Sequence, residues 1–193
     1  MRGEVRDRIL RVLMNNPTGK MSRYQIAKEA KSTYPWVREF LMKLADKKLV
    51  KDTKITDYPS LFQYWLKVTP KRKHRDYMVK KPMELLKNTK LNYALTTYQA
   101  ENLIQGYLFP SRTDIHIKKE ESEKWHEAII KTGLVGGGNF RINLSDEHIF
   151  YHLQEKDGLK IISTPQLIID LLKEGGTCTE AAEMLIGEMQ KHV

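Results

Sequence analysis

Three helical patterns followed by an alternating pattern occupy the first part of the chain, and this order restricts the folds open to it. Apolar residues at helical spacing predict a first helix of about fifteen residues that ends at residues 15–17. Ser22 and Gln25 form a capping box before a short second helix. A third helix begins near Thr33, with Pro35 in its first turn. Its expected buried stripe is Val37, Phe40, Leu41 and Leu44.

The period of the pattern changes from 3.6 to 2 after residues 47–48. Residues 49–55 and 62–68 are therefore predicted to form the two strands of a hairpin, connected by a turn over residues 56–61. Three helices followed by a hairpin is the order of a winged helix-turn-helix. In that architecture the second and third helices form the helix-turn-helix and the hairpin forms the wing.

The rest of the chain predicts a mixed α/β domain. Its expected helices cover residues 83–87, 120–130 and two segments that begin at Thr164 and Thr177, and a capping box at residues 96–99 begins another. Its expected strands are 114–117, then 134–135 and 140–144 around a turn at Gly136, Gly137 and Gly138, and then 148–154 and 159–162, paired across Asp157-Gly158. The predicted fold class is thus α+β, with domains at 1–78 and 79–193.

Charge is divided unequally along the sequence. Residues 1–81 hold 21 Lys and Arg against 8 Asp and Glu, a net of +13, whereas residues 82–193 hold 12 against 16, a net of −4. Positive charge concentrated on a small helical domain is typical of proteins that bind the phosphate backbone of nucleic acids. We therefore expect the winged helix to bind double-stranded DNA, with the third helix in the major groove.

The residues expected to contact DNA are basic, polar or aromatic and lie on the second and third helices, the hairpin and the segment after it. They are Arg23, Ser32, Thr33, Tyr34, Trp36, Arg38, Lys43, Lys51, Lys54, Lys71, Arg72, Lys73 and Arg75. Arg38 is the candidate for base readout, because its guanidinium can pair with guanine O6 and N7. Two alternatives stay open: Trp36 as a core residue that packs on the wing, and residues 71–75 as a solvated linker.

No catalytic residue, metal or cofactor is expected in the second domain. Its glycine run lacks the Lys-Ser/Thr of a phosphate-binding loop, and His148 and His152 have no third ligand nearby. Cys178 follows a helix cap, a position that can lower a thiol pKa, but packing is the preferred role. A small-residue turn at residues 94–97, followed by Asp114 on a strand, is similar to the nucleotidyltransferase fold. His116 stands at the second carboxylate position, so we expect a degenerate, inactive relative.

Several segments of the second domain follow one another in a fixed order: residues 93–100, 139–142, 150–151 and 158–167, the last continuing through residue 172 and a helix at 180–182. Together with the preceding winged helix, they resemble the AbiEi family of transcriptional regulators, the antitoxins of abortive-infection type IV toxin–antitoxin systems. The resemblance implies an autorepressor that binds promoter repeats. It also implies a C-terminal domain that counters a nucleotidyltransferase-like toxin functionally, without a stable complex.

Three alternatives to this interpretation remain: a nucleotidyltransferase-like or nuclease enzyme that uses Asp114, a ligand-sensing winged-helix regulator without a toxin, and a winged helix that binds protein. The first residues mix both charges without an apolar stretch, and no apolar run is long enough to span a membrane. With a single cysteine, these features predict a cytoplasmic protein without a membrane partner.

Overall fold

The computed structural model describes residues 2–191, and it shows an α+β protein in which N-terminal helices and a small hairpin precede a mixed seven-stranded sheet. The chain divides into two compact units. The first contains the residues up to Pro70, Thr164–Lys173 and the chain from Ala182 onward; the second contains Lys71–Ser163 and Glu174–Ala181. None of the described helices is long and apolar enough to cross a membrane.

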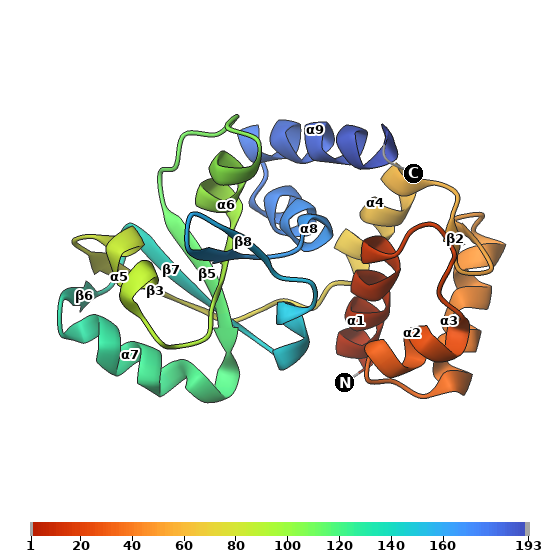
Figure 1. Ribbon diagram of the computed structural model, residues 1–193, viewed down its shortest axis with the longest axis horizontal. Helices are drawn as coiled ribbons and strands as arrows, with labels where there is room; N and C mark the ends of the chain where they lie inside the picture. The colour runs from red at the N-terminus through yellow and green to blue at the C-terminus, as the bar shows by residue number, and fades with distance from the viewer. Residues whose placement is uncertain (1, 192–193) are drawn as a thin grey trace. The chain divides into compact units, whose positions relative to one another are not determined.

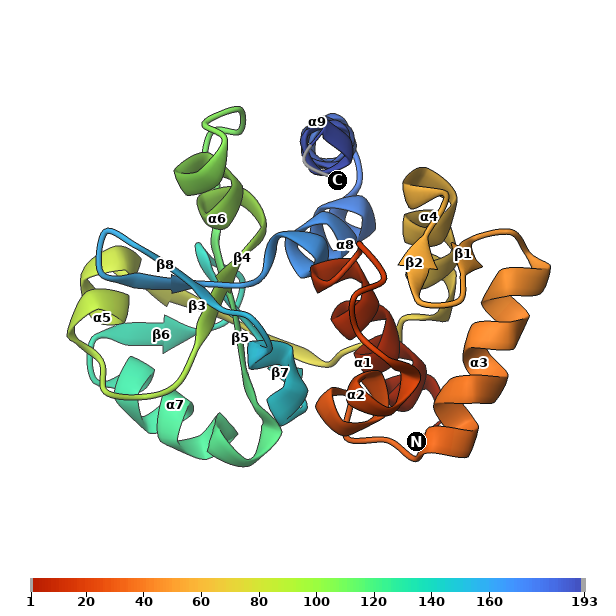
Figure 2. The ribbon, with the colours of Figure 1, turned by 45° about the vertical axis from the view of Figure 1, so that its right-hand side comes forward.

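The first unit is mostly helical. Its elements are α1 (Arg2–Asn15), α2 (Arg23–Glu29), α3 (Tyr34–Asp46), the two-residue strands β1 (Val50–Lys51) and β2 (Lys54–Ile55), α4 (Tyr58–Val68), nearly all of α8 (Thr164–Glu174) and the later part of α9 (Thr177–Lys191). Figure 2 shows β1 and β2 beside α4, and α8 alongside α1. The first three helices, the Ser22 capping box and the four predicted buried residues of α3 are confirmed.

The prediction that residues 62–68 form a strand is wrong, because they belong to α4. The side chain of Asp57 accepts a hydrogen bond from the backbone N–H of Ser60 at 3.0 Å and caps this helix. Its buried residues, Tyr58, Leu61, Phe62 and Trp65, recur at helical spacing. The predicted 49–55 strand is therefore reduced to a short hairpin, in which Val50 pairs with Ile55 and Lys51 with Lys54.

A buried polar network connects α1, α4 and α8. The Arg11 guanidinium, which is fully buried, donates to Asp7 Oδ2 at 2.6 Å and to Gln166 Oε1 at 2.8 and 3.0 Å. Asp7 Oδ1 accepts from the Trp65 indole N–H at 2.8 Å, and the Gln166 amide donates to Asp170 at 3.0 Å. Charge that has lost its water is thus paired within the protein, which is the condition under which a buried ion is tolerated.

The second unit is built on the seven-stranded sheet, whose order is β6-β3-β7-β5-β4-β9-β8. The strands are β3 (His74–Val79), β4 (Ala94–Thr96), β5 (Thr113–Lys118), β6 (Gly133–Val135), β7 (Phe140–Ser145), β8 (Gln154–Lys156) and β9 (Leu159–Ile161). The helices are α5 (Pro82–Asn88), α6 (Thr97–Ile104) and α7 (Ser122–Ile130), with single 3-10 turns η1 (Lys119–Glu121) and η2 (Glu147–Phe150).

Helix α7 covers the apolar face of this sheet (Figure 1). Trp125 of α7 is fully buried and meets Tyr93 edge-on, and the Tyr77 hydroxyl of β3 lies 3.1 Å from Nδ1 of His126. The predicted helices over 83–87 and 120–130 and the strand over 114–117 are confirmed. The hairpin across Asp157-Gly158 also forms, with both turn residues at positive φ as in a type I′ turn. The predicted strand over 148–154 is wrong except for its last residue, because residues 148–150 lie in η2 and β8 begins at Gln154.

The predicted capping box at residues 96–99 is wrong, because Thr96 precedes α6 but makes no side-chain capping bond. The predicted strands over 134–135 and 140–144 are confirmed as β6 and β7. They flank β3 on opposite sides, so the glycine-rich connection over residues 136–139 crosses over β3 at Tyr77. A Cβ on Gly138 would lie 2.3 Å from the Tyr77 carbonyl oxygen, which explains why a residue without a side chain occupies that position.

The compact units differ from the predicted division at 78/79. Strand β3 belongs wholly to the second unit, so that unit begins at Lys71. Helix α8, apart from Glu174, and the end of α9 return to the first unit, where Gln166 completes the Arg11 network. A hydrogen bond between residues so distant in sequence leaves no local pattern from which the return could have been predicted.

Replacing Arg11 with Ala should lower the free energy of unfolding by about 3–5 kcal/mol, because Asp7 would remain buried without its cation. Urea denaturation measures the loss. Lys191→Ala is the control: its 2.6 Å pair with Glu188 is exposed, so the expected loss is about 0–1 kcal/mol. Equal effects of the two substitutions would contradict the importance of the buried network.

Candidate nucleic-acid interface and a polar sheet face

The connection between α2 and α3 is short and is held by backbone hydrogen bonds. The N–H of Lys31 donates to the Lys28 carbonyl at 3.1 Å, and the N–H of Ser32 donates to the Ala27 carbonyl at 2.9 Å. With Lys31 at φ +48°, these bonds form a Schellman motif that ends α2. The half-buried Ser32 is therefore part of the turn, and α3 begins two residues later with Thr33 as its N-cap.

One side of α3 is exposed along its length. Buried residues occupy the opposite side, and Tyr34, Arg38 and Met42 succeed one another at intervals of four on the exposed side. Tyr34 is 44% and Met42 is 52% exposed. This part of the helix presents an aromatic ring, a guanidinium and an exposed N-cap, Thr33, to solvent.

Trp36 and Lys43 lie on a different side of α3. Together with Glu39 they line a small pocket that also includes Arg6 of α1 and Tyr64 of α4. Lys43 is 2.5 Å from Glu39, and the buried indole N–H of Trp36 has no hydrogen-bond partner among the described residues. The half-buried position of Trp36 favours the packing alternative for this residue, although the helix that it approaches is α4 instead of a wing strand.

The short hairpin carries two exposed lysines. Lys51 and Lys54 are direct cross-strand partners, so their side chains project from the same face. A β-bridge between Thr18 and Lys54 adds a third segment beside β2. Arg23, at the start of α2, forms a 2.7 Å ion pair with Asp52 in the hairpin turn and thereby connects the two elements.

Residues 71–75 lie in the second unit. Lys71 and Lys73 are exposed and Arg72 is half-buried, whereas Arg75 belongs to β3 and pairs with Glu123 at 3.0 Å. This segment therefore leads into the sheet, where Arg75 already forms an ion pair with Glu123.

The two compact units differ in net charge. In the first unit, residues 1–70, 164–173 and 182–193 hold 17 Lys and Arg against 10 Asp and Glu, a net of +7. The second unit is left with a net of +2 out of +9, so the imbalance persists but is smaller than the sequence division indicated.

The sheet of the second unit has one polar face. Asp76, Arg141, Asp114 and Thr96 are cross-strand neighbours in one row across four strands. Arg141 holds Asp76 with two hydrogen bonds of 2.7 and 3.1 Å. These bonds lower the pKa of the Asp76 carboxyl, so the pair stabilises the fold at neutral pH and loses that effect as the pH falls through the lowered pKa.

Asp114 is the centre of the network on this face. It is almost fully buried, and it accepts from Arg112 Nε at 2.5 Å, from Arg112 Nη2 at 2.9 Å and from the Thr97 hydroxyl. Arg112 also pairs with Glu174 at 3.0 Å and lies 5.6 Å from the ring centre of Tyr98. Both carboxylate oxygens of Asp114 are therefore occupied by protein donors, which is the arrangement of a structural ion pair.

Three residues near Asp114 have unusual backbone conformations or pKa values. Thr97 begins α6 at φ +50°, a left-handed conformation that β-branched residues rarely adopt, and its hydrogen bond to Asp114 helps to hold it. Burial raises the pKa of Tyr98 to about 12 and also raises the pKa of the Cys178 thiol. Cys178 is fully buried, so the structure favours its packing role over a reactive thiolate.

The histidines of the second unit form no recognisable metal site. His148 is buried and stacks on Tyr151, with ring centres 5.1 Å apart, whereas His152 is exposed. Nδ1 of His116 lies 2.9 Å from the Ser145 hydroxyl. Across residues 2–191, no group of three His, Cys, Asp or Glu side chains is placed to hold a metal ion.

The sequence did not predict the polar row of Asp76, Arg141, Asp114 and Thr96 on the sheet. Asp114 was predicted to lie on a strand, but its cation comes from Arg112 two residues earlier, and Asp76 and Arg141 meet only through strand pairing.

Comparison of the chain with protein-family models, curated proteins and solved structures found no significant match.

Replacing Asp114 with Ala should lower the free energy of unfolding by about 3–5 kcal/mol, because Arg112 would lose its main partner in a mostly buried position. The matched substitution is Lys118→Ala on the same strand, whose pair with the exposed Glu147 should contribute about 1 kcal/mol or less. Chemical denaturation of both variants tests the structural role. An unchanged midpoint for Asp114→Ala would contradict it.

The end of α3 provides a test of its own. Lys48 has φ +59°, and its N–H donates to the Ala45 carbonyl as in the motif that ends α2. Lys48→Gly should therefore raise the free energy of unfolding by about 1 kcal/mol, because glycine adopts this conformation without strain. The neighbouring Lys47 has φ −85°, and Lys47→Gly should instead lower stability by about 0.5–1 kcal/mol. Thermal unfolding distinguishes the two, and a gain from Lys47→Gly alone would be the opposite of this expectation.

Proposed function

We propose that the protein is a DNA-binding transcriptional regulator, and that α3 is its recognition helix. The observation that carries the proposal is the exposed side of α3, where Thr33, Tyr34 and Arg38 project from the N-terminal half of a helix that a four-residue turn joins to α2. A helix-turn-helix uses this half of its second helix to reach base edges in the major groove. The +7 charge of the unit favours approach to DNA.

The order of elements supports a winged helix with a reduced wing. A bridge at Thr18 between α1 and α2, followed by β1 and β2 after α3, provides three short strand segments around the helices. Lys51 and Lys54 lie directly opposite each other, and like charges in that position repel. A DNA phosphate bound between them would relieve this repulsion, so we assign backbone contacts to both.

The other predicted DNA contacts have unequal support. Arg38 retains the role of base reader because it is exposed on the free side of α3. Arg23 positions the hairpin through Asp52, whereas Trp36 and Lys43 line the pocket facing α1 and α4. Lys71, Arg72 and Lys73 precede β3 and are assigned, at most, secondary phosphate contacts.

Within this class, the AbiEi-type antitoxin is the regulator that the sequence resembles, and we retain it as the proposed subtype. Its support in the second unit is local. Strand β4 leads through the left-handed Thr97 into α6, and Asp114 follows on the antiparallel neighbour β5. This arrangement suits a degenerate nucleotidyltransferase-like fold, in which Arg112 neutralises the remaining carboxylate. An enzymatic function has less support, because His116 replaces the second carboxylate and Asp114 is already bound by Arg112 and Thr97.

Arg38→Ala should reduce the preference for upstream DNA of the protein's own gene over a scrambled duplex by about 10- to 100-fold, the size expected for loss of one bidentate base contact. Fluorescence anisotropy across a salt series measures both affinities. For wild-type protein with about six phosphate contacts, a fourfold rise in salt should weaken binding by roughly a thousandfold.

Lys43→Ala is the matched control, since it removes an exposed cation from the same helix but from the side that holds Glu39. It should leave the preference for upstream DNA almost unchanged. Equal loss of affinity for both duplexes in Arg38→Ala would contradict base readout by Arg38. Binding by wild-type protein that is equally weak for both duplexes would contradict the regulator itself.

A further inference from the structure

The two edges of the seven-stranded sheet differ in their protection. Strand β8 at one edge reads Gln-Glu-Lys, and charged side chains discourage pairing with another strand. Strand β6 at the other edge reads Gly-Leu-Val and is followed by three glycines, so no charge lies between residues 133 and 138. Leu134 is 72% and Val135 is 66% exposed. The β6 edge therefore has the properties that natural sheet edges usually avoid.

The hydrogen-bond pattern indicates which backbone groups of β6 face outward. The N–H of Gly136 donates to the Asp76 carbonyl at 3.0 Å. Leu134, two residues before Gly136, pairs with Met78, two residues after Asp76. In an antiparallel ladder, bonded and non-bonded positions alternate. Leu134 and Gly136 therefore turn their peptide groups toward β3, whereas Gly133 and Val135 turn theirs toward the open edge.

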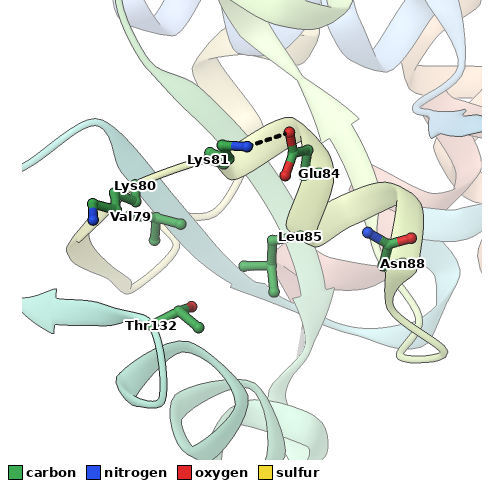
Figure 3. A pocket seen from close by; sticks show the side chains of 7 residues that line it. All are labelled: Val79, Lys80, Lys81, Glu84, Leu85, Asn88 and Thr132. Carbon is green, nitrogen blue, oxygen red and sulfur yellow. Dashed lines mark hydrogen bonds and ion pairs between the residues drawn. The ribbon is translucent and has the colours of Figure 1, made fainter.

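The side chains beside this edge form an apolar pair. Met78 of β3 and Leu134 of β6 are cross-strand partners, so they share a face of the sheet, and Met78 is 49% exposed. Figure 3 shows the segment at the start of this edge, where Val79 and Thr132 flank a pocket and Lys81 pairs with Glu84. The charged groups of this region thus lie toward one end of β6, and the strand itself is uncharged.

We propose that β6 pairs antiparallel with β6 of a second copy of the chain and joins the two sheets across a two-fold axis. In the register that places Leu134 opposite its own copy, Gly133 and Val135 exchange backbone hydrogen bonds across the axis. Met78 and Leu134 of both copies then form one continuous apolar row. Antiparallel strands place their starts at opposite ends of the pair. Lys80 and Lys81, near the start of β6, therefore lie far from the same lysines of the second copy.

A second copy fits this edge better than a charged peptide does, because an uncharged strand is electrostatically matched to itself. A dimer would also carry two copies of α3, the number that regulators of repeated half-sites use. The pairing itself does not depend on the proposed function, and its tests use no DNA. Loss of DNA binding and loss of pairing would therefore be separate results.

Cysteine crosslinking tests the register. In this arrangement residue 134 faces its own copy at a non-bonded position, where Cα atoms lie about 4.5 Å apart, within the range for a disulfide. Leu134→Cys should therefore form a covalent dimer under mild oxidation. Val135→Cys is the control. Residue 135 lies diagonal to its own copy at about 7–8 Å, so this variant should form little disulfide-linked dimer. Cys178 is fully buried and should not react. Equal crosslinking of both variants, or of neither, would overturn the register.

Sedimentation of the full chain tests the pairing. Wild-type protein should be a dimer at micromolar concentration, and Val135→Pro should be a monomer, since proline removes an outward N–H and leaves the bonds to β3 in place. Glu155→Pro on the charged β8 edge is the control and should remain a dimer. Circular dichroism establishes that both variants are folded. A wild-type monomer at about 100 µM, far above a micromolar dissociation constant, overturns the proposal. So does a folded Val135→Pro variant that stays a dimer.

Hydrogen exchange gives a readout that needs no variant. The amides of Gly133 and Val135 should exchange more slowly as the protein concentration rises, because pairing removes them from water. Exchange at these amides that is fast and independent of concentration would count against β6 as the interface, even if the protein dimerises.

Discussion

The buried guanidinium of Arg11 determines much of the arrangement of the first unit. A fully buried cation is tolerated only when its donors are met by protein acceptors, and here Asp7 and Gln166 supply them. Asp7 in turn accepts from Trp65, and that bond requires α4 to present its indole toward α1. Three helices from distant parts of the chain are therefore held by one charge and its neighbours. The hydrophobic effect by itself is not directional, so this network adds an orientation that apolar burial alone does not specify.

This network also explains why sequence-based prediction succeeded for some elements and not for others. The helices α1, α2 and α3 were predictable because their signals are local: apolar spacing, the Ser22 box and Pro35. Segment 62–68 misled because its aromatic and β-branched residues favour strands, while its helical spacing begins earlier, at Tyr58. The Asp57 cap was the missed signal. The return of α8 to the first unit had no local signal at all, because Gln166 meets Arg11 across 155 positions in sequence.

The candidate sites were likewise predictable only where the signal is local in sequence. The exposed side of α3 could be predicted because a helical period fixes which side chains are exposed, and Tyr34 and Arg38 are exposed as expected. Periodicity could not show that Lys43 would face α4, which was itself mispredicted. The row from Asp76 to Thr96 depends on strand order and register, which no local signal specifies.

The two units have different ways of managing charge, and this difference bears on what each can bind. The second unit neutralises its central residues internally: Arg112 and Arg141 hold Asp114 and Asp76. The hairpin of the first unit instead leaves Lys51 and Lys54 facing each other without such compensation between them. A folded domain keeps like charges adjacent only at a cost in stability, and an external polyanion removes that cost on binding. We therefore propose the lysine pair of the hairpin as the main phosphate-binding feature of the first unit, whereas the second unit offers an uncharged strand edge.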